Sequence, residues 1–445
     1  MRLRAVFGRQ TGNPQEEQVM YLTGADEGLQ REIDAFVAID SHAHPQPLGA
    51  EPAGVAESPI QPYEFELPKR MRPYNPEYLD AWSALWGYEH RDFEPGHLAN
   101  LMETKASIMA SHGLAYNPWV LDRLNLKSMV NINADIQETL PMARFPWCMH
   151  AEWMLWPFLC DPMPDGPSGR LFDTMVRKLK QFDREDVPGT VDAYLEQVVF
   201  ASLRSGKESG AIGIKFNTPY SRDLSFGSYD RADIEPLYAK GRRGRKQGTL
   251  SPSEHKAIQD YVFRAIALEA GRLDLAVQMH TGIGAKRQFR VSGSNPLLME
   301  TVFREASQTR FLLLHGGWPF VTETVTLTSY ANVYTDFSCA DLFQYPRSLS
   351  NQIRQALEWF PEKLMYGTDA YSDVAFGMLS GVPVRANPLH GWEEKAWMMD
   401  RTGRQALGLA LSGMMADGHI SGREAEAYVG MVMRGTVKEF HRLDD

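Results

Sequence analysis

Eight short hydrophobic runs are spaced along the chain, and each is about as long as a β-strand. In several of them apolar residues occupy consecutive positions, a pattern typical of parallel strands that are covered on both faces. The runs lie near 36–41, 128–133, 145–153, 211–217, 273–280, 310–317, 332–338 and 362–369, with the eighth strand itself near 363–369.

Helical patterns lie between these runs, with apolar residues at three- and four-residue spacing. They cover 190–206, 251–272, 296–309 and 348–361. The second of them begins with Ser251 and has Glu254 three residues later, which predicts a capping box at its first turn.

Strands that alternate with helices predict an α/β fold, and eight of them predict a (β/α)8 TIM barrel. A doubly wound sheet is the competing fold. It usually carries a glycine-rich phosphate turn after its first strand, and neither GxGxxG nor GxxxxGK[ST] occurs here. We therefore expect one barrel domain over residues 1–445, with insertions and a tail accounting for its length beyond the usual ~250 residues. The insertions are placed at 46–100, 156–187 and 218–250, and a helical tail at 389–445. The first and third insertions directly follow strands 1 and 4, so we expect them on the catalytic face as ordered lid or wall segments.

Composition and charge narrow the class of protein. The chain has 445 residues, of which 43% are hydrophobic and 23% charged, as in ordinary globular proteins. Its net charge of −10 argues against nucleic acid as the main partner. No apolar stretch is long enough for a signal peptide or a membrane span, and three cysteines are too few for a disulfide framework. We expect a cytoplasmic protein that acts on a small molecule, without nucleic acid or membrane partners.

Polar residues of the types that can form a metal site stand where the predicted strands end. Because the carboxyl ends of barrel strands converge on one site, these side chains are expected to meet there. Residues i and i+2 of a strand share a face, so both imidazoles of the first pair can reach one ion. A single histidine at a strand end is usually structural, and it is the joint occurrence that indicates a divalent metal site. The set is His42, His44, Lys215, His280, His315 and Asp369. His150 lies within the third strand and is left out of this set, although it could line the pocket.

Taken together, this order of residues resembles the amidohydrolase superfamily. The segments VQMHTGIG, LLLHGGWPF, NVYTDFS and KLMYGTDAY resemble its amidohydrolase-related branch, also called amidohydrolase 2. They are most similar to the amidohydrolase domain of nodulin-type and FluG-type glutamine synthetase fusions. The similarity is dense at 35–45 and 205–375 and weak elsewhere. Ala285 stands where this group carries an acidic residue, so the resemblance specifies the metal site more closely than the substrate.

The resemblance implies a metal-dependent hydrolase with one or two divalent ions per chain, zinc being the expected ion. In the binuclear form, His42, His44 and Asp369 hold one ion, while His280 and His315 hold the other. A carboxylated Lys215 bridges them, and Asp369 transfers the proton during hydrolysis of an amide, ester or lactone. Two alternatives remain open. One is a mononuclear decarboxylase or hydratase in which a bare lysine binds the substrate, and the other is a metal-binding regulatory domain without catalysis.

Four further residues are candidate substrate contacts. Tyr220 and Arg222 lie in GIKFNTPYSRDL, which resembles the group's segment after the strand-4 lysine, and the other two are Arg290 and Trp318. The predicted tail helix over 422–441 has an apolar stripe of Met and Val. Packing against the barrel or formation of a homo-oligomer would explain that stripe equally well.

Overall fold

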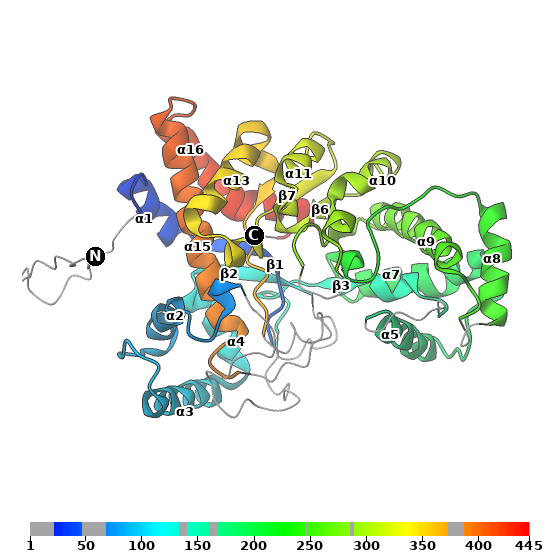
Figure 1. Cartoon of the computed structure of the whole chain (residues 1–445), viewed down its shortest axis with the longest axis horizontal. Coiled ribbons are helices and arrows are strands. Elements are labelled where there is room, and N and C mark those ends of the chain that lie inside the picture. Colours follow the sequence, from blue (N-terminus) through cyan, green and yellow to red (C-terminus); the bar gives the residue numbers. More distant parts are fainter. Residues whose placement is uncertain are drawn as a thin grey trace, which may run out of the picture.

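Eight strands run in order along the chain and lie among the helices shown in Figure 1. The computed structural model describes residues 22–46, 68–132, 140–159, 167–244, 248–284, 289–372 and 387–444. The strands are β1 (Ala38–Ala43), β2 (Leu126–Asn131), β3 (Cys148–His150), β4 (Gly213–Phe216), β5 (Ala276–Met279), β6 (Phe311–Leu313), β7 (Val333–Asp336) and β8 (Leu364–Met365). Each lies within or overlaps one of the eight predicted hydrophobic runs.

All neighbouring strands are parallel, and they follow one another around a barrel. β1 pairs with β2, and β3 to β8 form a continuous six-stranded sheet in chain order. Two single bridges join these parts: Asn131 pairs with Trp147 ahead of β3, and His44 pairs with Tyr371 beyond β8. The predicted TIM barrel is thereby confirmed.

The first strand does not stop where its apolar run stops. β1 continues to Ala43 and therefore contains His42. Its polar residues remain in the strand because the segment that follows β8 supplies backbone partners: Ser41 N donates to Tyr366 O at 3.0 Å, and Asp369 N donates to His42 O at 2.7 Å. The expectation that His42 follows the strand is corrected accordingly.

Helices connect the strands where the periodicity predicts them. The capping box is present, because Glu254 N donates to Ser251 Oγ at 3.3 Å and Ser251 N donates to Glu254 Oε2 at 2.9 Å. The α-helices are α1 (Glu27–Ala35), α2 (Glu77–Trp86), α3 (Pro95–His112), α4 (Tyr116–Arg123), α5 (Pro167–Gln181), α6 (Val191–Tyr194), α7 (Ala201–Glu208), α8 (Arg231–Arg243), α9 (Pro252–Arg272), α10 (Glu300–Glu305), α11 (Val321–Leu327), α12 (Ala340–Phe343), α13 (Pro346–Trp359), α15 (Trp392–Ala416), α16 (Gly422–Gly430) and α17 (Thr436–His441).

Short helices of other types supplement these. Two are single π-helical segments, η4 (Leu195–Phe200) and η10 (Met431–Gly435). The 3-10 segments are η1 (Lys69–Met71), η2 (Gly113–Ala115), η3 (Glu152–Leu155), η5 (Thr218–Tyr220), η6 (Val291–Ser294), η7 (Pro296–Met299), η8 (Leu314–Gly317) and η9 (Pro361–Lys363). No helix in the described part of the chain is long and apolar enough to cross a membrane.

The predicted insertions are largely helical where the structure describes them. The first contains α2 and the start of α3, the second contains α5, and the third contains α8, which packs beside α9 (Figure 1). Residues 47–67, 160–166 and 245–247 of these insertions lie outside the described residues.

The tail packs against the barrel. Val437 and Phe440 of α17 belong to one buried cluster with strand residues such as Ile39 and Leu312, which includes Val130, Ala276 and Met365 as well. Val432 O accepts a hydrogen bond of 2.9 Å from Tyr366 N. Contact with the barrel therefore accounts for the apolar stripe of the tail.

We expect Phe440→Ala to lower the free energy of unfolding by about 3–5 kcal/mol, because it empties a fully buried site in this cluster. Trp359→Ala is the control, since that side chain is 55% exposed and its loss should change stability by less than about 0.5 kcal/mol. Urea denaturation measures both. Equal stability losses would contradict a structural role for the tail.

Candidate metal centre

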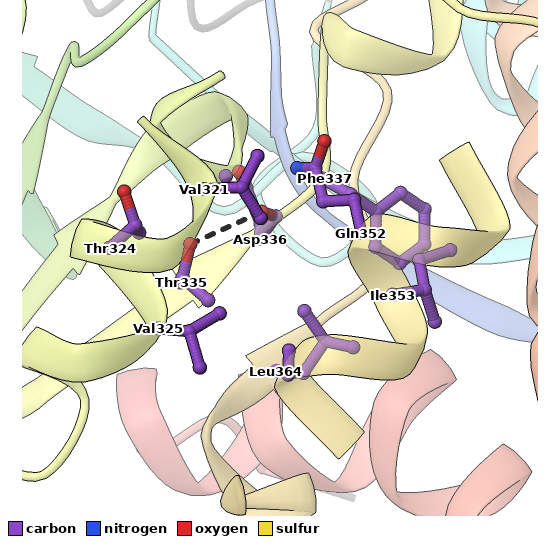
Figure 2. Close-up of a pocket in the computed structure, with 11 residues that line it drawn as sticks. Val321, Thr324, Val325, Thr335, Asp336, Phe337, Gln352, Ile353 and Leu364 are labelled. Carbon is purple, nitrogen blue, oxygen red and sulfur yellow. Dashed lines mark hydrogen bonds between the residues drawn. The ribbon is translucent and has the colours of Figure 1, made fainter. Parts of the chain in front are cut away.

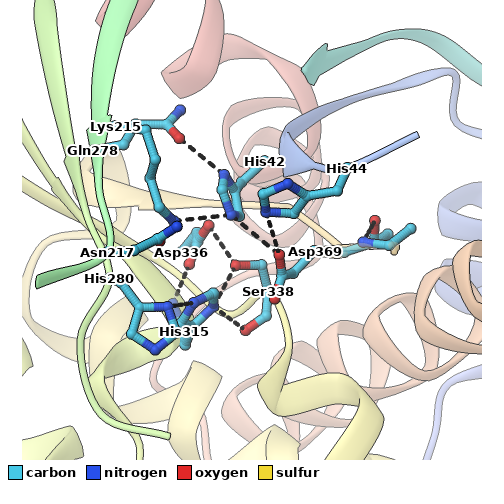
Figure 3. Close-up of polar contacts among 12 residues, drawn as sticks. His42, His44, Lys215, Asn217, Gln278, His280, His315, Asp336, Ser338 and Asp369 are labelled. Carbon is cyan, nitrogen blue, oxygen red and sulfur yellow. Dashed lines mark hydrogen bonds and ion pairs between the residues drawn. The ribbon is translucent and has the colours of Figure 1, made fainter. Parts of the chain in front are cut away.

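The six predicted ligands come together at one end of the barrel. Figure 3 shows the side chains of His42, His44, Lys215, His280, His315 and Asp369 directed toward one another. His42 Nε2 and His44 Nε2 lie 3.1 and 3.4 Å from Asp369 Oδ1. Lys215 Nζ lies 3.1 Å from His42 Nε2. All six residues are buried, so the cluster is largely removed from bulk water.

The hydrogen-bond partners of His42 determine which of its nitrogens carries the proton. Gln278 Nε2 donates to Ser41 O at 3.0 Å, which leaves the amide oxygen of Gln278 facing His42 Nδ1 at 2.9 Å. His42 Nδ1 must therefore be the donor, and its Nε2 presents a lone pair to the centre of the cluster. Such an outer acceptor is the usual partner of a metal-binding imidazole.

His280 and His315 are fixed in the same way. His280 Nε2 donates to Ile283 O at 2.7 Å, and His315 Nδ1 donates to Ser338 O at 3.1 Å. Their remaining nitrogens, His280 Nδ1 and His315 Nε2, then face each other at 3.0 Å as two acceptors. Two lone pairs at this distance need a cation or a proton between them.

Burial disfavours a proton between the two imidazoles and so favours a metal cation. Desolvation lowers the pKa of His42 and of His280 to about 3, and lowers the pKa of His315 well below its ordinary value. The three imidazoles are therefore neutral at pH 7 and have nitrogen lone pairs ready to bind. Neutral imidazole and carboxylate are ligands that zinc and other divalent transition metals accept, so the residues present fit such an ion.

Asp369 links two overlapping groups of candidate ligands. Burial alone would raise the pKa of Asp369, but the adjacent His42 and His44 imidazoles, 3.1 and 3.4 Å away, outweigh it and hold the pKa well below its usual range. One group is His42, His44 and Asp369, and the other is His315, Cys339 and Asp369, with the ligand atoms of each within 4.8 Å of one another. The structure thus offers two positions that share one carboxylate.

Two buried carboxyl groups hold the strand ends that carry the ligands. Asp40 Oδ1 accepts 3.0 Å hydrogen bonds from the backbone N–H groups of His42 and Thr368, which joins the ends of β1 and β8. Asp336 accepts a 2.7 Å bond from His315 N and a 3.1 Å bond from Ser41 Oγ. These hydrogen bonds fix the backbone that carries the ligands and so orient their side chains.

Three of the clustered residues have left-handed backbone conformations. His315, Cys339 and Asp369 have φ of 67°, 59° and 58° and follow β6, β7 and β8 in turn. The left-handed region costs a residue with a Cβ about 1–2 kcal/mol in conformational free energy. Such strain at three adjacent strand ends is typical of a functional site, where it turns side chains inward.

The four predicted substrate contacts are not equally close to this cluster. The Tyr220 ring lies 4.8 Å from the His280 ring, and Trp318 stacks on Phe343 at 6.5 Å. The guanidinium of Arg222 is paired with buried Asp260 at 2.6 Å.

Arg290 is exposed at the start of η6. Two of the four thus contact a clustered ligand: the Tyr220 ring lies against His280, and Trp318 N donates to His315 O at 3.0 Å. Ala285 lies outside the described residues.

Sequence reasoning missed several supporting residues. Gln278 stands two positions before His280, so strand periodicity places both on the same face. Asp336 and Ser338 lie in the segment NVYTDFS and Cys339 directly follows it, but the resemblance of that segment gave none of them a partner. Their partners are distant in sequence, so the patterns alone could not have paired them.

A small cavity lies behind Asp336, between β7, α11 and α13 (Figure 2). Its walls include Val325, Phe337 and Ile353, and its volume of about 10 Å³ is room for at most one water molecule. It therefore belongs to the packing beneath the ligands and is too small for a substrate.

We expect Gln278→Leu to weaken metal binding by about 10–100-fold, because the outer partner of His42 is lost and its tautomer is no longer fixed. Competition with a chromogenic chelator measures the affinity. Gln30→Leu is the control, since Gln30 of α1 is also buried but donates to the carbonyl of Arg404 on α15 at 3.4 Å, away from the metal centre. An unchanged affinity in Gln278→Leu would refute this role.

Solved structures of other proteins share the fold of this chain. A structure of uronate isomerase from Thermotoga maritima is 12% identical, with a TM-score of 0.62 over 95% of this chain and 100% of its own. A proposed metal-dependent hydrolase of Lactobacillus casei is 16% identical, with a TM-score of 0.56 over 93% of this chain and 97% of its own. These likenesses show a shared fold.

In sequence, the chain is 24% identical over 209 residues to protein FluG of Emericella nidulans, across 45% of this chain and 22% of FluG. This chain thus matches about a fifth of the length of that relative. The amidohydrolase family model (Amidohydro_2) matches residues 172–409, which is more than half of the chain. The chain belongs to the amidohydrolase family.

Proposed function

We propose that this protein is a metal-dependent hydrolase that cleaves an amide, ester or lactone bond of a small molecule. The observation that carries the proposal is the set of imidazole lone pairs that face one another and Asp369 in a desolvated cluster. Such a set binds a divalent cation, and membership of the amidohydrolase family supports its use in catalysis.

His42, His44 and Asp369 would hold one ion, for which zinc is the first candidate. When bound, such an ion polarises a carbonyl and lowers the pKa of a water to about 7. His280 and His315 would hold a second ion, and Cys339 lies within 4.8 Å of the ligand atoms of His315 and Asp369.

Asp369 is the proposed proton carrier. Its carboxylate stands at the meeting point of both ligand groups. It is held ionised, so it can accept a proton from an attacking water and return it to the leaving group. Tyr220, beside His280, is the substrate contact that its position favours most.

Lys215 is the proposed bridge between two ions. Burial lowers its pKa to about 8, so about one-tenth of it is neutral at pH 7. The neutral amine can attack CO2 with its lone pair and release one proton, which leaves a carbamate with two oxygen ligands.

A mononuclear lyase, such as a decarboxylase or hydratase, is the second candidate. The observation that favours it is the 3.1 Å contact between Lys215 Nζ and His42 Nε2, because it places a lysine nitrogen directly beside the ligands, where a substrate carboxylate could pair with it. In that case the ammonium form of Lys215 would bind a substrate carboxylate.

His42→Ala combined with His44→Ala should remove metal while the fold is retained, because the barrel interior lies beneath these residues. Metal analysis and circular dichroism measure the two effects. Wild-type metal content in the double variant would refute the ligand assignment.

Asp369→Asn should keep much of the metal yet lower kcat by about 10²–10⁴-fold, because the proton carrier is lost. The assay is turnover of a panel of amides, esters, lactones and aromatic carboxylic acids. Turnover restricted to decarboxylation or hydration would favour the lyase. Metal binding by the wild type without turnover of any compound would favour a regulatory domain.

Uptake of a second ion should increase from pH 7 to pH 9 in bicarbonate buffer, because the neutral fraction of Lys215 increases from about one-tenth to about nine-tenths. A carbamate resonance in ¹³C NMR with labelled bicarbonate checks the modification. Lys215→Met should abolish both effects. One ion per chain and an unmodified lysine at pH 9 would contradict the binuclear form.

A further inference from the structure

A second group of potential metal ligands lies outside the barrel, in the connection between α2 and α3 and the first turn of α3. His90, Asp92 and His97 each offer one ligand atom, and these atoms all lie within 4.8 Å of one another. His97 Nδ1 is 2.9 Å from Asp92 Oδ1. The imidazole rings of His90 and His97 are stacked at 3.6 Å with an interplanar angle of 8°.

The chain around these residues is anchored on both sides. Tyr88 is buried, and its hydroxyl donates to Asp92 O at 3.0 Å. The Phe93 ring packs on the buried Trp82 ring at 5.7 Å. These contacts hold the backbone that carries the ligands, so binding an ion would not need to order a free loop.

Local charge also suits a cation. Between residues 88 and 97 the sequence has three acidic residues, Glu89, Asp92 and Glu94, and one basic residue, Arg91. Arg91 points its guanidinium to Asp80 at 2.7 Å, so it pairs with a carboxylate of α2.

The three side chains can reach coordination distance of one ion by small rotations. Two ligands of a tetrahedral zinc stand about 3.3 Å apart, given metal–ligand distances of about 2.0–2.1 Å. His90 is exposed, and Asp92 and His97 are about two-fifths exposed in their side chains. Small side-chain rotations can therefore bring the three atoms together without disturbing the core.

We propose that His90, Asp92 and His97 form a site for a divalent transition metal, distinct from the barrel centre, that joins the end of α2 to the first turn of α3. Two imidazoles and one carboxylate favour zinc, nickel or copper over magnesium, which prefers oxygen ligands. Solvent completes the coordination at the exposed side. The proposal is independent of the reaction at the barrel.

The test is equilibrium dialysis of the full chain against micromolar zinc with excess magnesium, followed by metal analysis. Wild type should hold one more zinc per chain than a His90→Ala, His97→Ala variant, and that variant should keep its turnover. His419→Ala is the matched control, because His419 is also exposed but lies beside Arg354 instead. It should match wild type.

Asp92→Asn provides a second variant that leaves both imidazoles in place, and it should weaken zinc binding at this site by about ten-fold or more. Circular dichroism verifies that each variant is folded. Equal zinc content in wild type and in the folded double variant would overturn the proposal, as would full displacement of the extra zinc by magnesium.

Discussion

The site depends on one constraint: the nitrogen lone pairs of several imidazoles converge in a buried cluster, where desolvation disfavours protonation of the rings. His280 Nδ1 and His315 Nε2 face each other at 3.0 Å, and the outer nitrogen of each is committed to a carbonyl. Burial depresses the pKa of both rings. A divalent cation satisfies this arrangement, and the surrounding structure serves to hold it.

Support for the ligands reaches through the whole barrel. Asp40 and Asp336 bind the backbone and hydroxyl groups at the ends of β1, β6 and β8. Gln278 orients His42 from inside the barrel, and its amide nitrogen also approaches His441 of α17 at 3.3 Å. The C-terminal helix therefore does more than pack against the barrel, because its His441 contacts the residue that sets the tautomer of His42.

The sequence was sufficient for the barrel and for the convergence of six side chains. Consecutive apolar positions identified the strands, and residues such as Lys215 and His280 were then placed by the rule that strand ends meet. The predicted end of β1 was wrong, because apolar patterning does not show that Ser41 and His42 have backbone partners in the segment that follows β8. Gln278 and Cys339 were missed, since their partners are set by register and by left-handed turns. The pairing of Arg222 with Asp260 was likewise invisible, because it joins a loop to α9.

The most direct test of the central claim is anomalous diffraction at the metal absorption edge from crystals grown at neutral pH with zinc. The account predicts a peak about 2.0–2.2 Å from His42 Nε2 and Asp369, with a second near His280 and His315 if Lys215 bridges two ions. No peak among these residues in zinc-loaded crystals, with a proton shared between His280 and His315 instead, would contradict it.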